Sequence, residues 1–135
     1  MRLKRLVVVP LVMAIGCKPP TPAEQLDSIV SWVSTAKMAG DAWLRHTTPD
    51  KYTRQTLELS GQMLLETGSQ VLRSPPATLD SAAFDRALTS TRFNIAEMAR
   101  FVEEKDAGRF RQPWDSLRIY LKTMRDFSAS AAAGK

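Results

Sequence analysis

Apolar and small residues recur along most of this chain at alternating spacings of three and four, with polar residues between them. This rhythm is typical of helices that bury one face. It predicts four helices, which open near residues 22, 49, 80 and 113. The predicted inward-facing stripes are Leu26, Ile29, Val33, Ala36, Gly40, Trp43 and Thr47; Leu57, Gly61, Leu64, Gly68 and Val71; Phe84, Leu88, Thr91, Ile95, Met98 and Val102; and Trp114, Leu117, Leu121, Met124, Ser128 and Ala131.

Capping residues and prolines mark the predicted helix boundaries. Residues 21–24, Thr-Pro-Ala-Glu, have the pattern of a capping box with proline at the first helical position. That first helix is expected to run to His46, and Thr48 is expected to cap the second. Asp80 is the expected cap of the third helix, and Gly108 is its expected stop. Pro113 is expected to open the fourth helix.

The predicted fold is all-α. The heptad-like spacing favours shallow packing at about 20° between helices. Connections of roughly three to seven residues make successive helices antiparallel. The sequence therefore predicts one domain over residues 22–132, an up-down-up-down antiparallel four-helix bundle.

Symmetry about the expected loops places four small or weakly polar residues at one height near the middle of the bundle. They are Ala36, Gly61, Thr91 and Ser128. This layer has two interpretations. It lines a cavity for a small apolar ligand or a cofactor, or the helices approach closely there and the two hydroxyls bond backbone carbonyls.

The start of the chain has the organisation of a signal peptide. Three basic residues precede an apolar stretch, Leu6–Gly16, of 11 residues. A membrane-spanning helix needs about 20 apolar residues, so this stretch has the size of a signal-peptide core instead. We therefore expect residues 1–16 to be a cleaved leader.

The only cysteine, Cys17, directly follows this leader in the sequence Ala14-Ile15-Gly16-Cys17. This stretch resembles the lipobox of bacterial lipoproteins, with Ala14 at the position where leucine is usual. The resemblance implies a diacylglyceryl group on the Cys17 sulfur, an acylated amino terminus and a short tether, residues 17–21. It also implies a membrane partner reached through the lipid, and Lys18 after the cysteine favours the outer membrane in a Gram-negative host. The alternatives are plain secretion with an unmodified Cys17 and an uncleaved anchor.

Charge argues against nucleic acid as a partner. The whole chain has a formal net charge of +5. Without the three basic residues of the leader, 16 basic and 14 acidic residues remain, a net charge of +2. Since a nucleic-acid footprint must belong to the folded domain, no nucleic-acid binding is expected.

One segment is a candidate docking site for another envelope protein, and the alternative is a solvated end of the bundle with mixed charge. Arg109-Phe110-Arg111 is expected to form the loop between the third and fourth helices. Aromatic and arginine side chains are favoured in binding hot spots, so these three residues are the expected contacts.

Few residues suggest chemistry. His46 is the only histidine, and its neighbours offer no metal-ligand spacing. The chain has no Cys-x-x-Cys-His motif for covalent haem and no Glu-x-x-His motif of di-iron bundles, so its methionines are expected to fill the core. We expect a non-enzymatic envelope lipoprotein without metal or cofactor, acting as an adaptor or binding module. The alternative is a periplasmic carrier of a small apolar ligand, and the sequence leaves the oligomeric state open.

Overall fold

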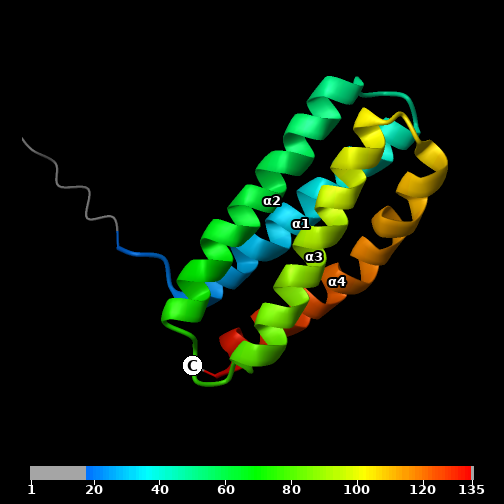
Figure 1. Cartoon of the computed structure of the whole chain (residues 1–135). Coiled ribbons are helices and arrows are strands. Elements are labelled where there is room, and N and C mark those ends of the chain that lie inside the picture. Colours follow the sequence, from blue (N-terminus) through cyan, green and yellow to red (C-terminus); the bar gives the residue numbers. More distant parts are fainter. Residues whose placement is uncertain (1–17, 135) are drawn as a thin grey trace, which may run out of the picture.

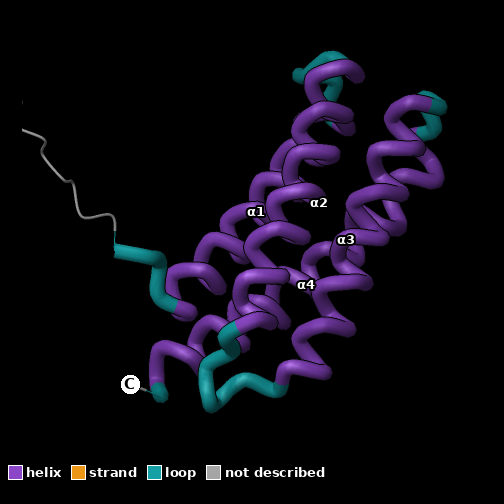
Figure 2. The backbone as a smooth tube through the Cα atoms, turned by 60° about the vertical axis from the view of Figure 1, so that its left-hand side comes forward, coloured by secondary structure: helices purple, strands orange, loops and turns teal. Residues whose placement is uncertain are grey.

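The computed structural model describes residues 18–134, which form a bundle of four helices (Figure 1). The helices are α1 (Pro22–Leu44), α2 (Asp50–Arg73), α3 (Ser81–Glu103) and α4 (Ala107–Ala133). Each packs against two neighbours, in the cyclic order α1, α2, α3, α4. A second view shows helices and loops and no strand in this part of the chain (Figure 2). The all-α prediction is therefore confirmed.

The predicted stripes form the core. Nearly all of their members are buried, and the largest fully buried side chains include Leu26, Leu57, Phe84 and Leu117. The exception at the end of the first stripe is Thr47, which is exposed because α1 stops before it. The spacing of three and four thus identified the buried face of every helix.

Two of the predicted N-terminal caps are present. The Glu24 backbone N–H donates to the Thr21 hydroxyl at 3.2 Å, and the Thr21 N–H donates to the Glu24 carboxylate at 3.3 Å. These are the two reciprocal bonds of a capping box. At α3, the Ala83 N–H donates to the Asp80 carboxylate at 3.0 Å.

The junction between α1 and α2 differs from the prediction. α1 ends at Leu44 rather than at His46, because residues 45–47 form a left-handed cap. In it, His46 has a φ of 59° and its N–H donates to the Trp43 carbonyl, while the Thr47 N–H donates to the Ala42 carbonyl. This is the bond pattern of a Schellman motif. Thr48 does not cap α2, whose N-cap is Pro49 without a side-chain bond.

The junction between α3 and α4 is also displaced. α3 ends at Glu103, and a second Schellman cap follows, with Lys105 at a φ of 56°. Asp106 then accepts the Arg109 N–H at 3.0 Å, so α4 begins at once, at Ala107. The predictions of Gly108 as a stop and of Pro113 as a start are therefore wrong, since both lie inside α4.

The two short connections, 45–49 and 104–106, meet at one end of the bundle, which we call the loop end (Figure 1). There the ring of Trp43 lies 4.7 Å from that of Phe110, centroid to centroid, and the Trp43 N–H donates to Asp50 at 2.7 Å. The chain enters α1 at the opposite end. The predicted leader, residues 1–16, and Cys17 lie outside the described residues.

Candidate binding groove between two helices

An open groove of about 440 Å³ runs between α2 and α3. Its floor is apolar, since the side chains of Leu57 and Ile95 close it from below and both are buried. Charged residues form its edges. The lining residues are Leu57, Glu58, Gly61, Gln62, Arg92, Ile95, Ala96, Ala99, Arg100 and Glu103.

Gly61 keeps the middle of the groove open. A Cβ atom built there would meet only the Ile95 Cγ2 atom, at 4.0 Å, which is ordinary contact. The other buried helical glycines differ. A Cβ at Gly40 would lie 2.5 Å from the Trp114 Cδ1 atom, and one at Gly68 would overlap Leu88. Close packing therefore explains Gly40 and Gly68 but leaves Gly61 unexplained, although glycine inside a helix costs about 0.5–1 kcal/mol relative to alanine.

Arg92, at one end of the groove, has an unused donor. Its Nε atom is buried and has no hydrogen-bond partner among residues 18–134. No acidic group in that part of the chain forms an ion pair with it. A buried donor without a partner costs roughly 1–3 kcal/mol.

The other end of the groove carries charges of both signs. Arg54 lies between two carboxylates, with its Nε 3.7 Å from Glu58 and its Nη1 3.5 Å from Glu103. Like the Nε of Arg92, the Arg54 Nε is buried and has no hydrogen-bond partner among residues 18–134. Along α3, the eleven residues from Arg92 to Glu103 correspond to about 16 Å. Arg100 also lines the groove near Glu103, so basic and acidic side chains are mixed along its length.

The groove continues toward the loop end. A second hollow of about 290 Å³ shares Glu103 with it. Its lining residues are Asp50, Lys51, Arg54, Val102, Glu103 and Lys105. Together the two hollows form an elongated groove with an apolar floor and charged residues of both signs along its edges.

The predicted docking segment is placed differently from the expectation. Arg109, Phe110 and Arg111 lie in the first turns of α4 rather than in a loop, and Phe110 is fully buried against Trp43. The prediction of Phe110 as an exposed contact is therefore wrong. Arg109 and Arg111 are exposed, and the Arg109 Nε lies 3.5 Å from the Asp106 carboxylate.

The four residues predicted to share a layer do not meet. Ala36 and Thr91 are fully buried, and the Thr91 hydroxyl donates to the Ala87 carbonyl at 2.7 Å, as the close-packing interpretation expects. Ser128 instead donates to the carboxylate of Asp27, nine residues and about 13 Å before Ala36 on α1. Gly61 faces Ile95. The shared layer is wrong because the displaced start of α4 shifts its pairing with α3.

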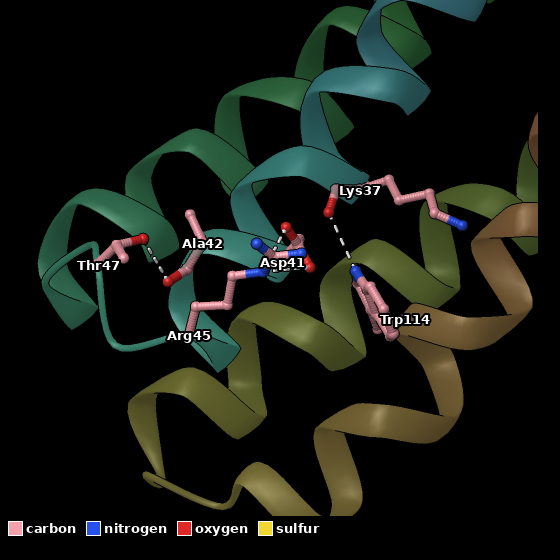
Figure 3. Close-up of polar contacts among 6 residues, drawn as sticks. All are labelled: Lys37, Asp41, Ala42, Arg45, Thr47 and Trp114. Carbon is pink, nitrogen blue, oxygen red and sulfur yellow. Dashed lines mark hydrogen bonds and ion pairs between the residues drawn. The ribbon is translucent and has the colours of Figure 1, made fainter.

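The remaining candidate residues contribute to the helix caps, the core or the contacts between helices. His46 is the exposed left-handed residue of the α1 cap. Met98 and Met124 fill the core, but Met38 is 72% exposed, so the prediction that the methionines are core residues is wrong for Met38. Trp114 donates its N–H to the Lys37 carbonyl at 3.0 Å and so ties α4 to α1 (Figure 3). The same view shows Arg45 against Asp41, and Thr47 bonded to Ala42, at the end of α1. Within residues 18–134, no three potential metal ligands gather at one point.

Sequence reasoning missed the groove, although a signal for it is present. On α2 and α3 a second stripe with spacings of four, three and four runs beside the core stripe, and on α2 the two stripes share Gly61. On α2 and α3 these stripes contain small residues where solvent-facing positions are usually long and polar. They are Arg54, Glu58, Gly61 and Leu65 on α2, and Arg92, Ala96, Ala99 and Glu103 on α3.

Comparison with protein-family models, with curated proteins and with solved structures finds no match for this chain. The class of protein is thus defined by its fold, an all-helical four-helix bundle with a groove between α2 and α3. None of the four described helices is both long and apolar enough to cross a membrane.

Proposed function

We propose that this chain is a lipid-anchored protein of the bacterial cell envelope, acylated at Cys17, whose bundle is a non-enzymatic protein-binding module. The leader and the lipobox-like residues 14–17 support the anchor. Lys18 after the cysteine supports the outer membrane in a host with two membranes. The groove between α2 and α3 supports the binding function.

In this proposal the bundle is up-down-up-down and antiparallel. The short connections support that topology, as do contacts between residues far apart in the sequence. The Gln25 side chain donates to Gln70 at 3.3 Å, and the rings of Phe84 and Phe127 lie 5.6 Å apart. The anchor and the Glu103 end of the groove then lie at opposite ends of the bundle.

The observation that carries the binding function is the open space above Gly61. Folding gains nothing evident from a helix-interior glycine that contacts little. The glycine makes sense when another molecule occupies the groove. The carrier alternative rested on a cavity at the four small residues or on the methionine-containing core. Ser128 bonds to Asp27 and leaves that layer, and Met98 and Met124 are fully buried side chains of the core, so neither feature favours a carrier.

The anchor is tested by mass spectrometry of the amino-terminal peptide, purified from bacteria that express the full chain. We expect cleavage before Cys17 and a mass increase that matches diacylglyceryl plus an N-acyl chain. The Cys17→Ser variant should lack the lipid and leave the membrane fraction. Mature protein with a bare Cys17 would refute the anchor.

The binding function is tested by photo-crosslinking in the same cells. A benzophenone amino acid at Gln62, on the edge of the groove, should yield a protein adduct. The matched control is Arg118, which is exposed on α4. Equal adducts from both positions, or none from Gln62, would contradict a binding function for this groove.

A further inference from the structure

The outer surface that α1 and α2 share is almost free of charge. The bond from the Gln25 side chain to Gln70 marks this side of both helices. Spacings of three and four keep side chains on one helical face over several turns. The twelve positions in line with these two glutamines, which we call the α1–α2 face, are Gln25, Ser28, Trp32, Thr35, Ala39 and Ala42 on α1, and Tyr52, Thr56, Leu59, Met63, Glu66 and Gln70 on α2. Glu66 is the only charged residue among them.

Large apolar side chains of this face are open to solvent. Tyr52 is 63% exposed and Leu59 is 47% exposed, while Trp32 and Met63 are half-buried. By contrast, half of the eight edge positions of the groove between α2 and α3 are charged. Exposed apolar surface that is continuous over two helices marks a site of interaction.

The two threonines of the α1–α2 face do not depend on water for their hydroxyl groups. Thr35 donates to the Ser31 carbonyl at 2.8 Å, and Thr56 donates to the Tyr52 carbonyl at 2.9 Å. Another surface can therefore cover both threonines without leaving an unpaired donor.

Residues at the same height on α1 and α2 differ in size. The bond between Gln25 and Gln70 and the bond between Trp43 and Asp50 pair the two helices by height. Counted from these bonds, the pairs are Ala42 with Tyr52, Ala39 with Thr56, Thr35 with Leu59, Trp32 with Met63, and Ser28 with Glu66. In every pair except the one with Trp32, the smaller side chain belongs to α1.

This difference makes the face complementary to itself. A twofold axis parallel to the helices brings α1 of one copy against α2 of a second copy at the same heights. Ala42 then meets Tyr52 of the second copy, and Trp32 meets Met63, whose sulfur makes favourable contacts with aromatic rings. Glu66 meets a serine hydroxyl rather than another carboxylate. Neither copy therefore has to bury two like charges against each other.

The same axis agrees with the proposed anchor. Because it is parallel to the helices, it places the first helical residue of both copies, Pro22, at one end of the pair. Both Cys17 residues can then enter one membrane. A lipid surface suits the face less well, since helices that lie on membranes carry lysine or arginine beside their apolar side chains, and none of the twelve positions does.

The size of the face sets the strength of the contact. From Gln25 to Ala42, α1 is about 26 Å long, and two helices side by side are about 20 Å wide. The two copies together would cover about 1,000 Å², which is at the lower limit of specific interfaces. Such a pair is weak in free solution, and confinement to one membrane raises the effective concentration of its members.

We infer that the α1–α2 face binds a second copy of this chain, in a twofold pair whose members stand side by side with their anchors at the same end. This inference goes beyond the proposed binding function, because it leaves the groove between α2 and α3 of each copy open. Only the orientation of the pair rests on the anchor.

The test is disulfide crosslinking between two differently tagged copies of the full chain, expressed together in bacteria. One copy carries Ala39→Cys and the other carries Thr56→Cys, which the inference places opposite each other. Mild oxidation of intact cells should yield a mixed dimer with a disulfide between residues 39 and 56. The control pair, Ala39→Cys with Arg118→Cys on α4, should yield little or none. Copies without an introduced cysteine measure any contribution from Cys17.

A charge on the face should separate the two copies. Leu59→Glu in both copies should lower the yield of the mixed dimer roughly tenfold, because the pair would bury the new carboxylates. Leu65→Glu is the matched control, since Leu65 also lies on α2 and is 45% exposed, but on the groove side. It should leave the yield unchanged. Thermal unfolding followed by circular dichroism verifies that each variant is folded.

Several results would overturn the inference. They are absence of the mixed dimer, equal yields from Thr56→Cys and Arg118→Cys, and equal effects of the two glutamates. A benzophenone amino acid at Thr35 identifies what covers the face, and an adduct with lipid or with a different protein would also overturn the second copy. The adduct at Gln62 reports on the groove separately. A bare Cys17 together with the 39–56 disulfide would refute the anchor and retain the pair.

Discussion

Glycine illustrates how one residue type serves different purposes in this bundle. Gly40 lies against the ring of Trp114, and that ring is fixed because its N–H bonds to the Lys37 carbonyl. Gly61 faces open space over the groove. Sequence position within a helix does not distinguish the two, because both occupy inward-facing positions of their stripes.

Alanine substitution should separate these two purposes. Gly61→Ala should stabilise the protein by about 0.5–1 kcal/mol, since alanine loses less backbone freedom in a helix and meets no obstacle there. Gly40→Ala should destabilise it by about 1–3 kcal/mol through overpacking against Trp114. Urea unfolding measured by circular dichroism gives both free energies. The reverse order would mean that the space above Gly61 is not open in solution.

The sequence predicted the buried faces of the helices, but it did not predict where several of the helices end and begin. Spacing identified all four buried faces, because core positions repeat through each helix. Boundaries at residues 45–47 and 104–106 escaped prediction, because His46 and Lys105 stand where glycine usually ends a helix. Pro113 suggested a helix start, but Asp106 caps α4 two turns earlier and Pro113 is buried inside it.

The spacing of apolar residues on the inward face of α4 nevertheless indicates where this helix begins. Phe110, Leu117, Met124 and Ala131 recur every seven residues and are all buried. That period extends the helix upstream of Pro113 and places Phe110 inside. The groove was harder to predict, because its stripes matter only once α2 and α3 are known to be adjacent, and because the unpaired state of Arg92 is a tertiary property.

The end of α3 offers a test of its left-handed cap. Lys105→Gly should raise the free energy of unfolding by about 1 kcal/mol, because a side chain at a φ of 56° crowds the backbone and glycine does not. Lys105→Ala keeps the Cβ atom and should give no such gain. Urea midpoints of the two variants, compared with the wild type, measure the difference. Equal midpoints for the two variants would contradict a left-handed Lys105.

Across the whole molecule, the loop end is held together by aromatic contact. Trp43 of α1 bonds to Asp50 of α2 and packs against Phe110 of α4, so one cluster joins three helices. This cluster occupies the segment that the sequence suggested as a docking surface. Its burial assigns Phe110 to stability.

Substitutions in that segment should therefore affect stability and not recognition. Phe110→Ala should destabilise the bundle by about 3–5 kcal/mol through the cavity that it leaves. The exposed neighbour Arg111 serves as the control, and Arg111→Ala should change stability by less than about 0.5 kcal/mol. Thermal and urea unfolding measure both. A mild effect at Phe110 together with loss of the crosslinked partner would favour the docking role instead.

The short stretch before α1 and the length of α1 together determine how high the molecule can stand above a lipid surface. Residues 18–20 contribute about 9 Å at the rise of a proline-rich chain. The 23 residues of α1 contribute about 35 Å. With Cys17 acylated and the bundle upright, Glu103 would stand roughly 40 Å above the bilayer. A partner that binds at this height must extend well into the aqueous compartment. A partner confined to the headgroup layer could be contacted only if the bundle lay flat on the membrane.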